Sequence, residues 1–359
     1  MAATHTNRIP IYGWLVPLVA LLGALAVGKN GHWAAGVGLA VALVAAVLVA
    51  VHHAELVAHW LGEPYGTLVL TLAVTVIELS LIVSMMLAGD PSPSLARDTV
   101  YAVVMLVLNG LAGICIVAGT LRHREQEFQT LGANAFLAVL MPMAILVLIM
   151  PNHTLTTPGP YFSQLQLGFI GTVCFALYVA FLFVQTVRHQ DYFVPSGAPD
   201  TEPHAAPSAR IGMISAGLLI LSLVAVILLA KLLAPFIERG IAASAAPASL
   251  AGVIVAAIVL LPESVTAMRA ARRNQLQISI NLSLGSAVAC IGLTVPSVTI
   301  IAWWLGLPLA LGISSGAEVL LVLSFLVAML TYGQGRTNLL AGFVHLVLLA
   351  SYVFMIFAP

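Results

Sequence analysis

The sequence predicts an all-α polytopic membrane protein, on the evidence of its composition and of the lengths of its apolar runs. Hydrophobic residues make up 61% of its 359 residues and charged residues 7%, whereas soluble domains carry roughly 25% charged residues. Apolar runs of about 20 residues, the length that crosses the hydrocarbon core of a bilayer, follow one another along the chain. Helices satisfy their own backbone hydrogen bonds in lipid, and the alternating ten-residue segments typical of a β-barrel are not found in the sequence.

Glycine, proline and charged residues divide the chain into about eleven predicted membrane spans. Their expected extents are 11–28, 33–53, 66–88, 98–121, 131–151, 164–188, 210–235, 249–271, 277–301, 308–331 and 337–357. The first span could also be read as a signal peptide, with Arg8 before it and the cleavage-site pattern Ala24-Leu25-Ala26 at its end. Trp14, Pro17 and the direct continuation into a second span favour a retained helix.

The predicted domains are an extra N-terminal transmembrane helix (1–30), a first five-helix repeat (31–188), a cytoplasmic linker (189–209) and a second five-helix repeat (210–359). The linker is the least apolar connection, and its proline, glycine and acidic residues are typical of a flexible segment. Five spans per repeat force the second repeat to enter the membrane upside down. Inverted repeats are typical of secondary transporters, which bind their substrate near the bilayer midplane.

The positions of lysine and arginine predict the orientation, because cytoplasmic loops carry an excess of basic residues. With the N-terminus in the cytoplasm, nine of the thirteen basic residues fall on the inner side. The inner set is Arg8, Arg122, Arg124, Arg188, Arg210, Arg269, Arg272, Arg273 and Arg336, and the outer set is Lys29, Arg97, Lys231 and Arg239. We therefore expect a cytoplasmic N-terminus and, because the number of predicted spans is odd, a C-terminus on the outer side of the membrane.

Two acidic residues, Glu78 and Glu263, are the main candidates for a functional site. A charged group at the bilayer centre costs about 3 kcal/mol or more, so such a carboxylate indicates function. Thr71, Thr75 and Glu78 follow an i, i+4, i+7 spacing and share one helix face. Pro262 removes one backbone amide next to Glu263, which favours local unwinding and free carbonyl groups. A helix–helix hydrogen bond is the alternative role for each glutamate, and bonding to their own helix is the alternative for the threonines.

Small and polar residues on two further spans extend this candidate site. The stretch Leu106-Val107-Leu108-Asn109-Gly110 parallels Leu282-Ser283-Leu284-Gly285-Ser286 in the second half, and Asn281 precedes the latter. Small residues allow close helix approach, and oxygen ligands from carboxylates, amides and hydroxyls suit hard cations such as calcium. Burial also favours the protonated form of a carboxyl group. We therefore predict that protons and a metal cation compete for Glu78 and Glu263.

Other polar residues of the spans carry weaker signals. Glu318 is a third buried acid near the middle of the predicted tenth span, with a supporting role or a helix–helix bond as its two interpretations. His52, Glu55 and His59 share one helix face and could bind a metal, but they lie at a predicted membrane interface where such residues are common. His345 is either a proton relay or a histidine with satisfied hydrogen bonds.

Several partners and cofactors are not expected. The net charge of zero gives no reason to predict a nucleic-acid partner. The three cysteines, Cys115, Cys174 and Cys290, lie in apolar runs without metal-binding spacing, so neither disulfides nor a zinc site are expected. No cofactor is predicted apart from the transported ions, and the sequence leaves the oligomeric state open, a homo-oligomer included.

The segments that carry the candidate residues resemble the cation/proton exchanger branch of the calcium/cation antiporter superfamily, and in particular the bacterial ChaA-type antiporters. These segments are GEPYGTLVLTLAVTVIELSLI from Gly62, DTVYAVVMLVLNGLAGICIVAG from Asp98, PESVTAMRAARRNQLQISINLSLGSAVACIGLTVP from Pro262, GAEVLLVLSF from Gly316 and GRTNLLAG from Gly335. The resemblance extends from about residue 50 to the end of the chain. It implies paired repeats whose glutamates, here Glu78 and Glu263, bind the transported cation.

The resemblance implies exchange of cytoplasmic calcium for external protons, with sodium or potassium as the alternative cargo. Many eukaryotic relatives carry Gly-Asn ahead of the acidic residue, where this chain has Val74-Thr75 and Val259-Leu260. A channel and an intramembrane metalloprotease using the histidines around His52 are the other functions considered. The sequence lacks the HExxH and GxSxG motifs of such proteases, so we do not predict an enzyme.

Overall fold

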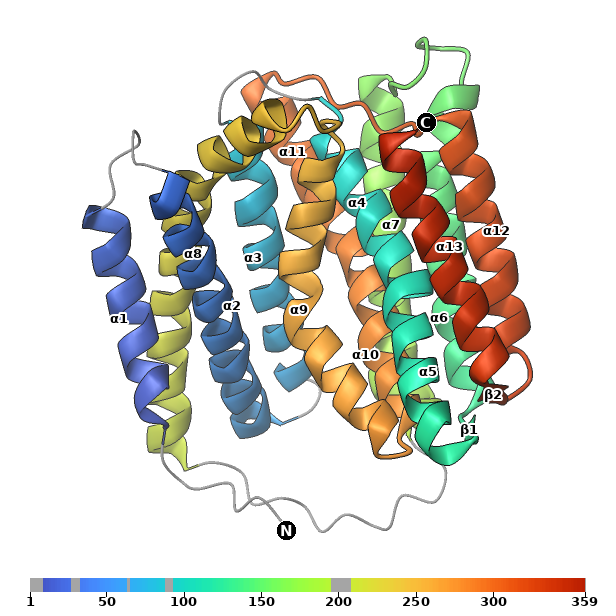
Figure 1. Ribbon diagram of the computed structural model, residues 1–359, viewed down its shortest axis with the longest axis horizontal. Helices are drawn as coiled ribbons and strands as arrows, with labels where there is room; N and C mark the ends of the chain where they lie inside the picture. The colour runs from blue at the N-terminus through green and yellow to red at the C-terminus, as the bar shows by residue number, and fades with distance from the viewer. Residues whose placement is uncertain (1–8, 27–32, 63–64, 88–92, 195–207, 359) are drawn as a thin grey trace. The chain divides into compact units, whose positions relative to one another are not determined.

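The computed structural model describes residues 9–26, 33–62, 65–87, 93–194 and 208–358, and this part of the chain is predominantly helical (Figure 1). Among the described residues, ten helical segments are long and apolar enough to cross a membrane, and the shorter apolar helix α1 precedes them. The predicted all-α polytopic class is confirmed. The structure adds one small feature, an antiparallel pair of three-residue strands, β1 (Glu125–Glu127) and β2 (Arg336–Asn338).

The chain divides into two compact units, and each unit combines helices from both halves of the sequence. The first unit contains α1 (Ile11–Ala26), α2 (Trp33–Leu61), α3 (Tyr65–Met86) and α8 (Ala209–Ala243). The second contains α4 (Leu95–Met105), η1 (Leu106–Leu111), α5 (Ala112–His123), α6 (Thr130–Leu148), η2 (Met150–His153), α7 (Gln164–Phe183), η3 (Val184–Arg188), η4 (Gln190–Tyr192), α9 (Leu250–Arg272), α10 (Leu276–Ala289), η5 (Cys290–Thr294), α11 (Val295–Leu305), α12 (Ser315–Tyr332), α13 (Leu339–Phe357) and both strands. Each unit thus contains helices from both predicted repeats, and the inverted repeats themselves stay a prediction.

In the first unit, α2 and α8 form the central helix pair, and both also pack against α1 and α3. Small residues permit this close packing: a Cβ atom added to Gly212 of α8 would lie 2.2 Å from the Trp60 ring of α2. The buried His53 of α2 has its Nε2 atom 3.1 Å from the Gly13 carbonyl oxygen of α1. This contact fixes the N-terminal helix to the unit.

In the second unit, α9 packs against α4, α5 and α10. At one end of α9, a Cβ atom on Gly252 would lie 2.5 Å from the Asp98 carbonyl carbon of α4. Further along, Ser279 of α10 donates a 2.6 Å hydrogen bond to the Ala267 carbonyl of α9. Helix α13 lies beside α5 and α12 (Figure 1). The helix that carries Glu263 is therefore held along its length by three neighbours.

Two long spans are interrupted by π-helical turns that the sequence did not predict. The span from Leu95 to His123 contains η1, and the span from Leu276 to Leu305 contains η5. A π-helical turn holds one residue more than an α-helical turn, and such insertions frequently occur at functional sites. Each π segment follows the acidic helix of its own half at nearly the same distance along the sequence, since η1 starts at Leu106 and η5 at Cys290.

Three span boundaries differ from the prediction. Helix α2 continues to Leu61 and α8 to Ala243, beyond the predicted ends at 53 and 235, because charged residues such as glutamate and arginine are good helix formers and do not by themselves end a helix. The predicted span 308–331 begins only at Ser315. The residues before it are held outside a helix by backbone hydrogen bonds, including those from Ala310 to Pro93 and from Ile313 to Leu148.

The structure describes the first residues of the predicted linker 189–209. Its first residues form η4, and Phe193 packs against the rings of Phe136 and Phe181 at centroid distances of 5.4 and 5.9 Å. Asn281 of α10 donates a 2.6 Å hydrogen bond to the Phe193 carbonyl oxygen. The start of this segment is therefore anchored to the second unit, while positions 195–207 of the predicted linker lie outside the described residues.

Candidate functional site

Glu78 lies within α3 of the first unit, and its side chain is 2% exposed. Thr71, Thr75 and Glu78 all fall in this unbroken helix, so the spacing places them on one face as expected. The Thr75 hydroxyl donates a 2.9 Å hydrogen bond to the Thr71 carbonyl oxygen of its own helix. This is the alternative role considered for the threonine, and it leaves Glu78 as the chemically distinctive group on the face.

Glu263 lies within α9 of the second unit, directly after the buried Pro262. The helix runs without interruption from Leu250 to Arg272, so the expected local unwinding is not observed, although Figure 1 shows α9 changing direction along its length. Side-chain hydroxyls support the turns on both sides of Glu263. Ser264 donates to the Leu260 carbonyl at 2.7 Å, and Thr266 donates to the Pro262 carbonyl at 3.1 Å.

Asn109 and Gly110 lie in η1, which packs against α9, α10, α12 and α13. The fully buried Asn109 side chain contacts α12 and α13: its amide nitrogen donates to Ser324 Oγ at 2.9 Å, and its Oδ1 lies 3.4 Å from His345 Nδ1. Gly110 gives room to α13, since a Cβ atom there would lie 3.4 Å from Leu349. The π turn that carries Asn109 thus contacts the Glu263 helix, whereas the Asn109 amide bonds to other helices.

The second polar segment is less uniform than its sequence suggests. Ser283 donates hydrogen bonds to the Ser279 and Ile280 carbonyls of its own helix. Asn281 accepts a 2.8 Å hydrogen bond from Gln277 and donates to Phe193, so its amide anchors the segment after η3. Both side chains therefore have structural partners in the second unit.

Gly285 and Ser286 occupy the regular helix α10, and a Cβ atom on Gly285 would meet the Phe136 ring at 3.5 Å. The sequence paired these residues with Asn109 and Gly110. The π segment of this span is instead η5 at Cys290–Thr294, which follows Glu263 at nearly the distance at which η1 follows Glu78. Thr294 of η5 is fully buried and was not among the candidate residues predicted from the sequence. Its position directly before Val295-Pro296 is the sequence feature that could have indicated it.

Glu318 is displaced from its expected position. It lies in the first turn of α12 and not near the middle of a span, because that helix begins at Ser315. One of its carboxylate oxygens accepts a 2.7 Å hydrogen bond from Asn152 and lies 3.7 Å from His153 Nε2. A carboxylate in the first turn also interacts favourably with the helix dipole. These contacts support the interpretation of Glu318 as a structural residue that joins η2 to α12.

The weaker metal candidates gain no support. His52, Glu55 and His59 all lie within α2, which extends through them to Leu61. In the part of the chain that the structure describes, no group of three or more histidine, cysteine, aspartate or glutamate side chains could hold a metal ion. The three cysteines are free and buried. His345, by contrast, belongs to a buried polar cluster that includes Asn109.

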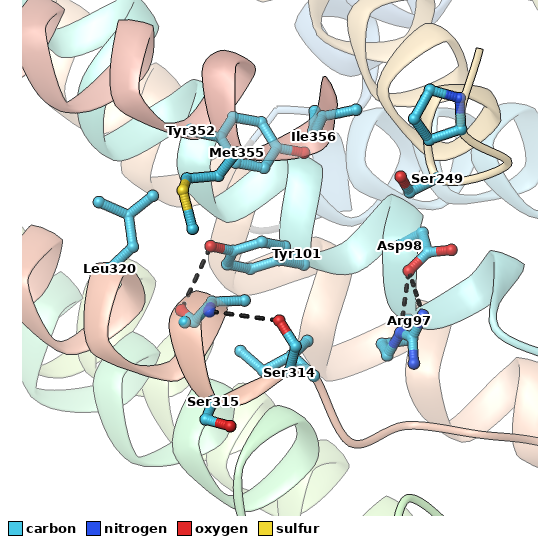
Figure 2. Close-up of a pocket in the computed structure, with 14 residues that line it drawn as sticks. Arg97, Asp98, Tyr101, Ser249, Ser314, Ser315, Leu320, Tyr352, Met355 and Ile356 are labelled. Carbon is cyan, nitrogen blue, oxygen red and sulfur yellow. Dashed lines mark hydrogen bonds and ion pairs between the residues drawn. The ribbon is translucent and has the colours of Figure 1, made fainter. Parts of the chain in front are cut away.

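A cavity of about 440 Å³ opens in the second unit between α4, α12, α13 and the residues before α9 (Figure 2). Arg97 and Asp98 form an ion pair at 2.8 Å on its wall, and Ser94 donates to the other Asp98 oxygen. Tyr101 donates a hydrogen bond to the Ala317 carbonyl. The cavity is lined by neutral or mutually paired groups, so it offers no unbalanced charge to an ion.

Known proteins share the sequence of this chain over most of its length. Residues 31–187 and 214–358 match the sodium/calcium exchanger protein family. The y4hA protein of Sinorhizobium fredii is 42% identical over 99% of this chain and 98% of its own length. The sodium-potassium/proton antiporter ChaA of Escherichia coli is 38% identical over 86% of this chain and 84% of its own length.

Among solved structures, the fold resembles that of YfkE, a Ca²⁺/H⁺ antiporter. The TM-score is 0.73 at 17% sequence identity, and the match covers 97% of this chain and 99% of YfkE. The first matched stretch contains α3, the helix of Glu78, and η1, and the second contains α9, the helix of Glu263, and η5. The chain belongs to the sodium/calcium exchanger protein family.

Proposed function

We propose that this protein is a secondary active antiporter that exchanges cytoplasmic calcium, or alternatively sodium or potassium, for external protons. The observation that carries this proposal is the presence of one carboxylate, Glu78 or Glu263, within an apolar helix of each matched stretch of an exchanger-family chain. Buried acids of this kind mark ion and proton pathways in membrane proteins. We place the protein in the bacterial inner membrane with a cytoplasmic N-terminus and a periplasmic C-terminus.

The proposed mechanism uses each carboxylate in two states. A deprotonated carboxylate supplies a hard oxygen ligand for a cation, and a protonated carboxyl group does not. Because burial in the membrane favours the neutral form, loss of the cation is coupled to uptake of a proton. Binding of either species at Glu78 and Glu263 then yields exchange in opposite directions, driven by the proton gradient, by alternating exposure of the site to the two sides.

Sodium and potassium are the alternative cargo to calcium. The relative ChaA is named a sodium-potassium/proton antiporter, and YfkE is named a Ca²⁺/H⁺ antiporter. The positions three residues before the two glutamates are Thr75 and Leu260, so one of them offers a hydroxyl and the other offers no side-chain oxygen. Calcium takes six to eight oxygen ligands, so the missing side-chain oxygen at position 260 weakens the argument for calcium selectivity.

The experiment is cation-driven dissipation of a pH gradient in everted membrane vesicles and in proteoliposomes, with calcium, sodium and potassium compared at several pH values. We expect exchange in the wild type and its loss in Glu78→Gln and in Glu263→Gln, because glutamine has the size of glutamate but carries no charge and does not titrate. Retention of exchange by either variant would contradict the assignment of that residue. Cation flux without proton coupling would instead identify a channel.

A further inference from the structure

A buried polar cluster in the second unit connects three helices at the η1 turn. We define it as Asn109 of η1, Ser324 and Thr331 of α12, and His345 of α13. Asn109, Ser324 and His345 are fully buried and Thr331 is 9% exposed. Buried polar groups are costly unless they are hydrogen-bonded, and networks whose members are all paired give a segment one defined geometry.

Each group in the cluster has a partner of the right kind. Asn109 donates to Ser324 Oγ at 2.9 Å, and Ser324 donates to the Leu320 carbonyl at 2.7 Å. His345 Nε2 lies 3.0 Å from the Thr331 hydroxyl, and Nδ1 lies 3.4 Å from Asn109 Oδ1. Because Asn109 Oδ1 can only accept, Nδ1 carries the hydrogen, and Nε2 of the neutral ring accepts from Thr331.

The imidazole also holds the backbone of the π turn. His345 also interacts with the backbone of Leu108. In this turn the Ala112 amide bonds to the carbonyls of Asn109 and Val107 and passes over that of Leu108. Wider i→i+5 bonding of this kind displaces the regular i→i+4 ladder. His345 therefore contacts both the side chain and the main chain of the turn at the point where the helix is irregular.

We propose that His345 and Ser324 are positioning residues of the cation site: they hold the η1 turn against α9, the helix of Glu263, and thereby set cation selectivity without touching the ion. This inference rests on the proposed exchange function. The η1 turn packs against α9 on one side and against α12 and α13 on the other. Release of the α12 and α13 contacts lets the turn relax, which changes the spacing of oxygen ligands beside Glu263, and different cations respond differently to that spacing.

Two substitutions at His345 separate its two contacts. The amide of asparagine reaches the position of Nδ1, so His345→Asn keeps a donor for Asn109 and Leu108 and loses the Thr331 contact. The amide of glutamine reaches the position of Nε2, so His345→Gln keeps the Thr331 contact and loses the contacts with η1. Ser324→Ala removes the partner of the Asn109 amide. Ser222→Ala is the matched control, because Ser222 is equally buried but bonds only to the Leu218 carbonyl of its own helix.

The measurement is the half-saturation concentration of exchange for calcium, sodium and potassium in proteoliposomes with equal amounts of folded protein, verified by gel filtration. We expect His345→Gln and Ser324→Ala to change the ratio of these concentrations between cations by about three- to tenfold, the effect of one buried hydrogen bond. His345→Asn and Ser222→Ala should retain the wild-type ratio.

Equal ratios in the wild type, His345→Gln and Ser324→Ala would overturn the inference, even if all variants were less stable. A change of the same size in His345→Asn as in His345→Gln would also contradict it, since the contact with η1 would then not be the decisive one. Different results would contradict the proposed function: no cation exchange by the wild type, or retained exchange by Glu263→Gln. A failure of the positioning role leaves both of those results intact.

Discussion

Gly252 of α9 lies directly against the backbone of Asp98 in α4, so that a Cβ atom on the glycine would be 2.5 Å from the Asp98 carbonyl carbon and 2.6 Å from the Thr99 nitrogen. Both obstacles are main-chain atoms and neither can rotate away. This contact sets the distance between the Glu263 helix and the helix that leads into η1. It is a property of the backbone path and depends on the absence of one methyl group.

We expect Gly252→Ala to destabilise the protein and to reduce exchange. In an exposed helix, alanine in place of glycine is favourable by about 1 kcal/mol, so a loss of stability would reveal the clash. Gly240→Ala is the control, because nothing lies within 4 Å of a Cβ atom at that position of α8. Thermal unfolding of the purified protein measures the effect. A Gly252→Ala variant as stable as Gly240→Ala would contradict the close packing of α4 and α9.

Glu318→Gln should retain exchange, in contrast to Glu263→Gln. The glutamine oxygen can still accept the hydrogen bond from Asn152, while the loss of charge removes the interaction with the α12 dipole, which contributes about 0.3–1 kcal/mol. The expected result is a slightly lower unfolding temperature with an unchanged cation dependence of transport. Loss of exchange in a folded Glu318→Gln variant would show that this acid takes part in ion or proton binding after all.

Asn281→Ala should free the segment that starts at His189 without changing cation selectivity. Its amide holds the Phe193 carbonyl at 2.6 Å, and such a part-buried hydrogen bond contributes about 0.5–1.5 kcal/mol. We therefore expect faster tryptic cleavage after the neighbouring Arg188, which is exposed. The half-saturation concentrations for calcium, sodium and potassium should stay at wild-type values. A selective change for one cation would restore Asn281 as a ligand candidate.

Much of the architecture could be predicted from features of each membrane span taken by itself. The length of each apolar run and the charged residues between runs were enough to predict the helices that carry Glu78 and Glu263, because insertion in lipid depends on local hydrophobicity. Glu318 shows the limit of this signal. The residues before Ser315 are apolar but not helical, since their amides bond to the distant carbonyls of Pro93, Leu148 and Pro160.

The site was less predictable than the fold, because its details depend on contacts between helices. Asn109 and Asn281 are both asparagines in apolar spans, yet the first bonds across to α12 and α13 and the second anchors a loop segment. The π turns could not be predicted from the sequence either. Hydrophobic periodicity locates a turn only where polar and apolar faces alternate, and the residues on all sides of η1 are buried.

The π turn at η1 has a consequence for changes in chain length. Each residue of an α-helix advances the chain by about 100° around the axis. A π turn takes up one extra residue while the α-helical segments on either side keep their register. Deletion of one residue between Leu106 and Leu111 would therefore convert the wide turn to a regular one and leave Gly113 facing Leu346 and Gly342 of α13. The same deletion within α5 would rotate the rest of that helix by this angle, so the register of the span should survive a shortening at η1 but not one beside it.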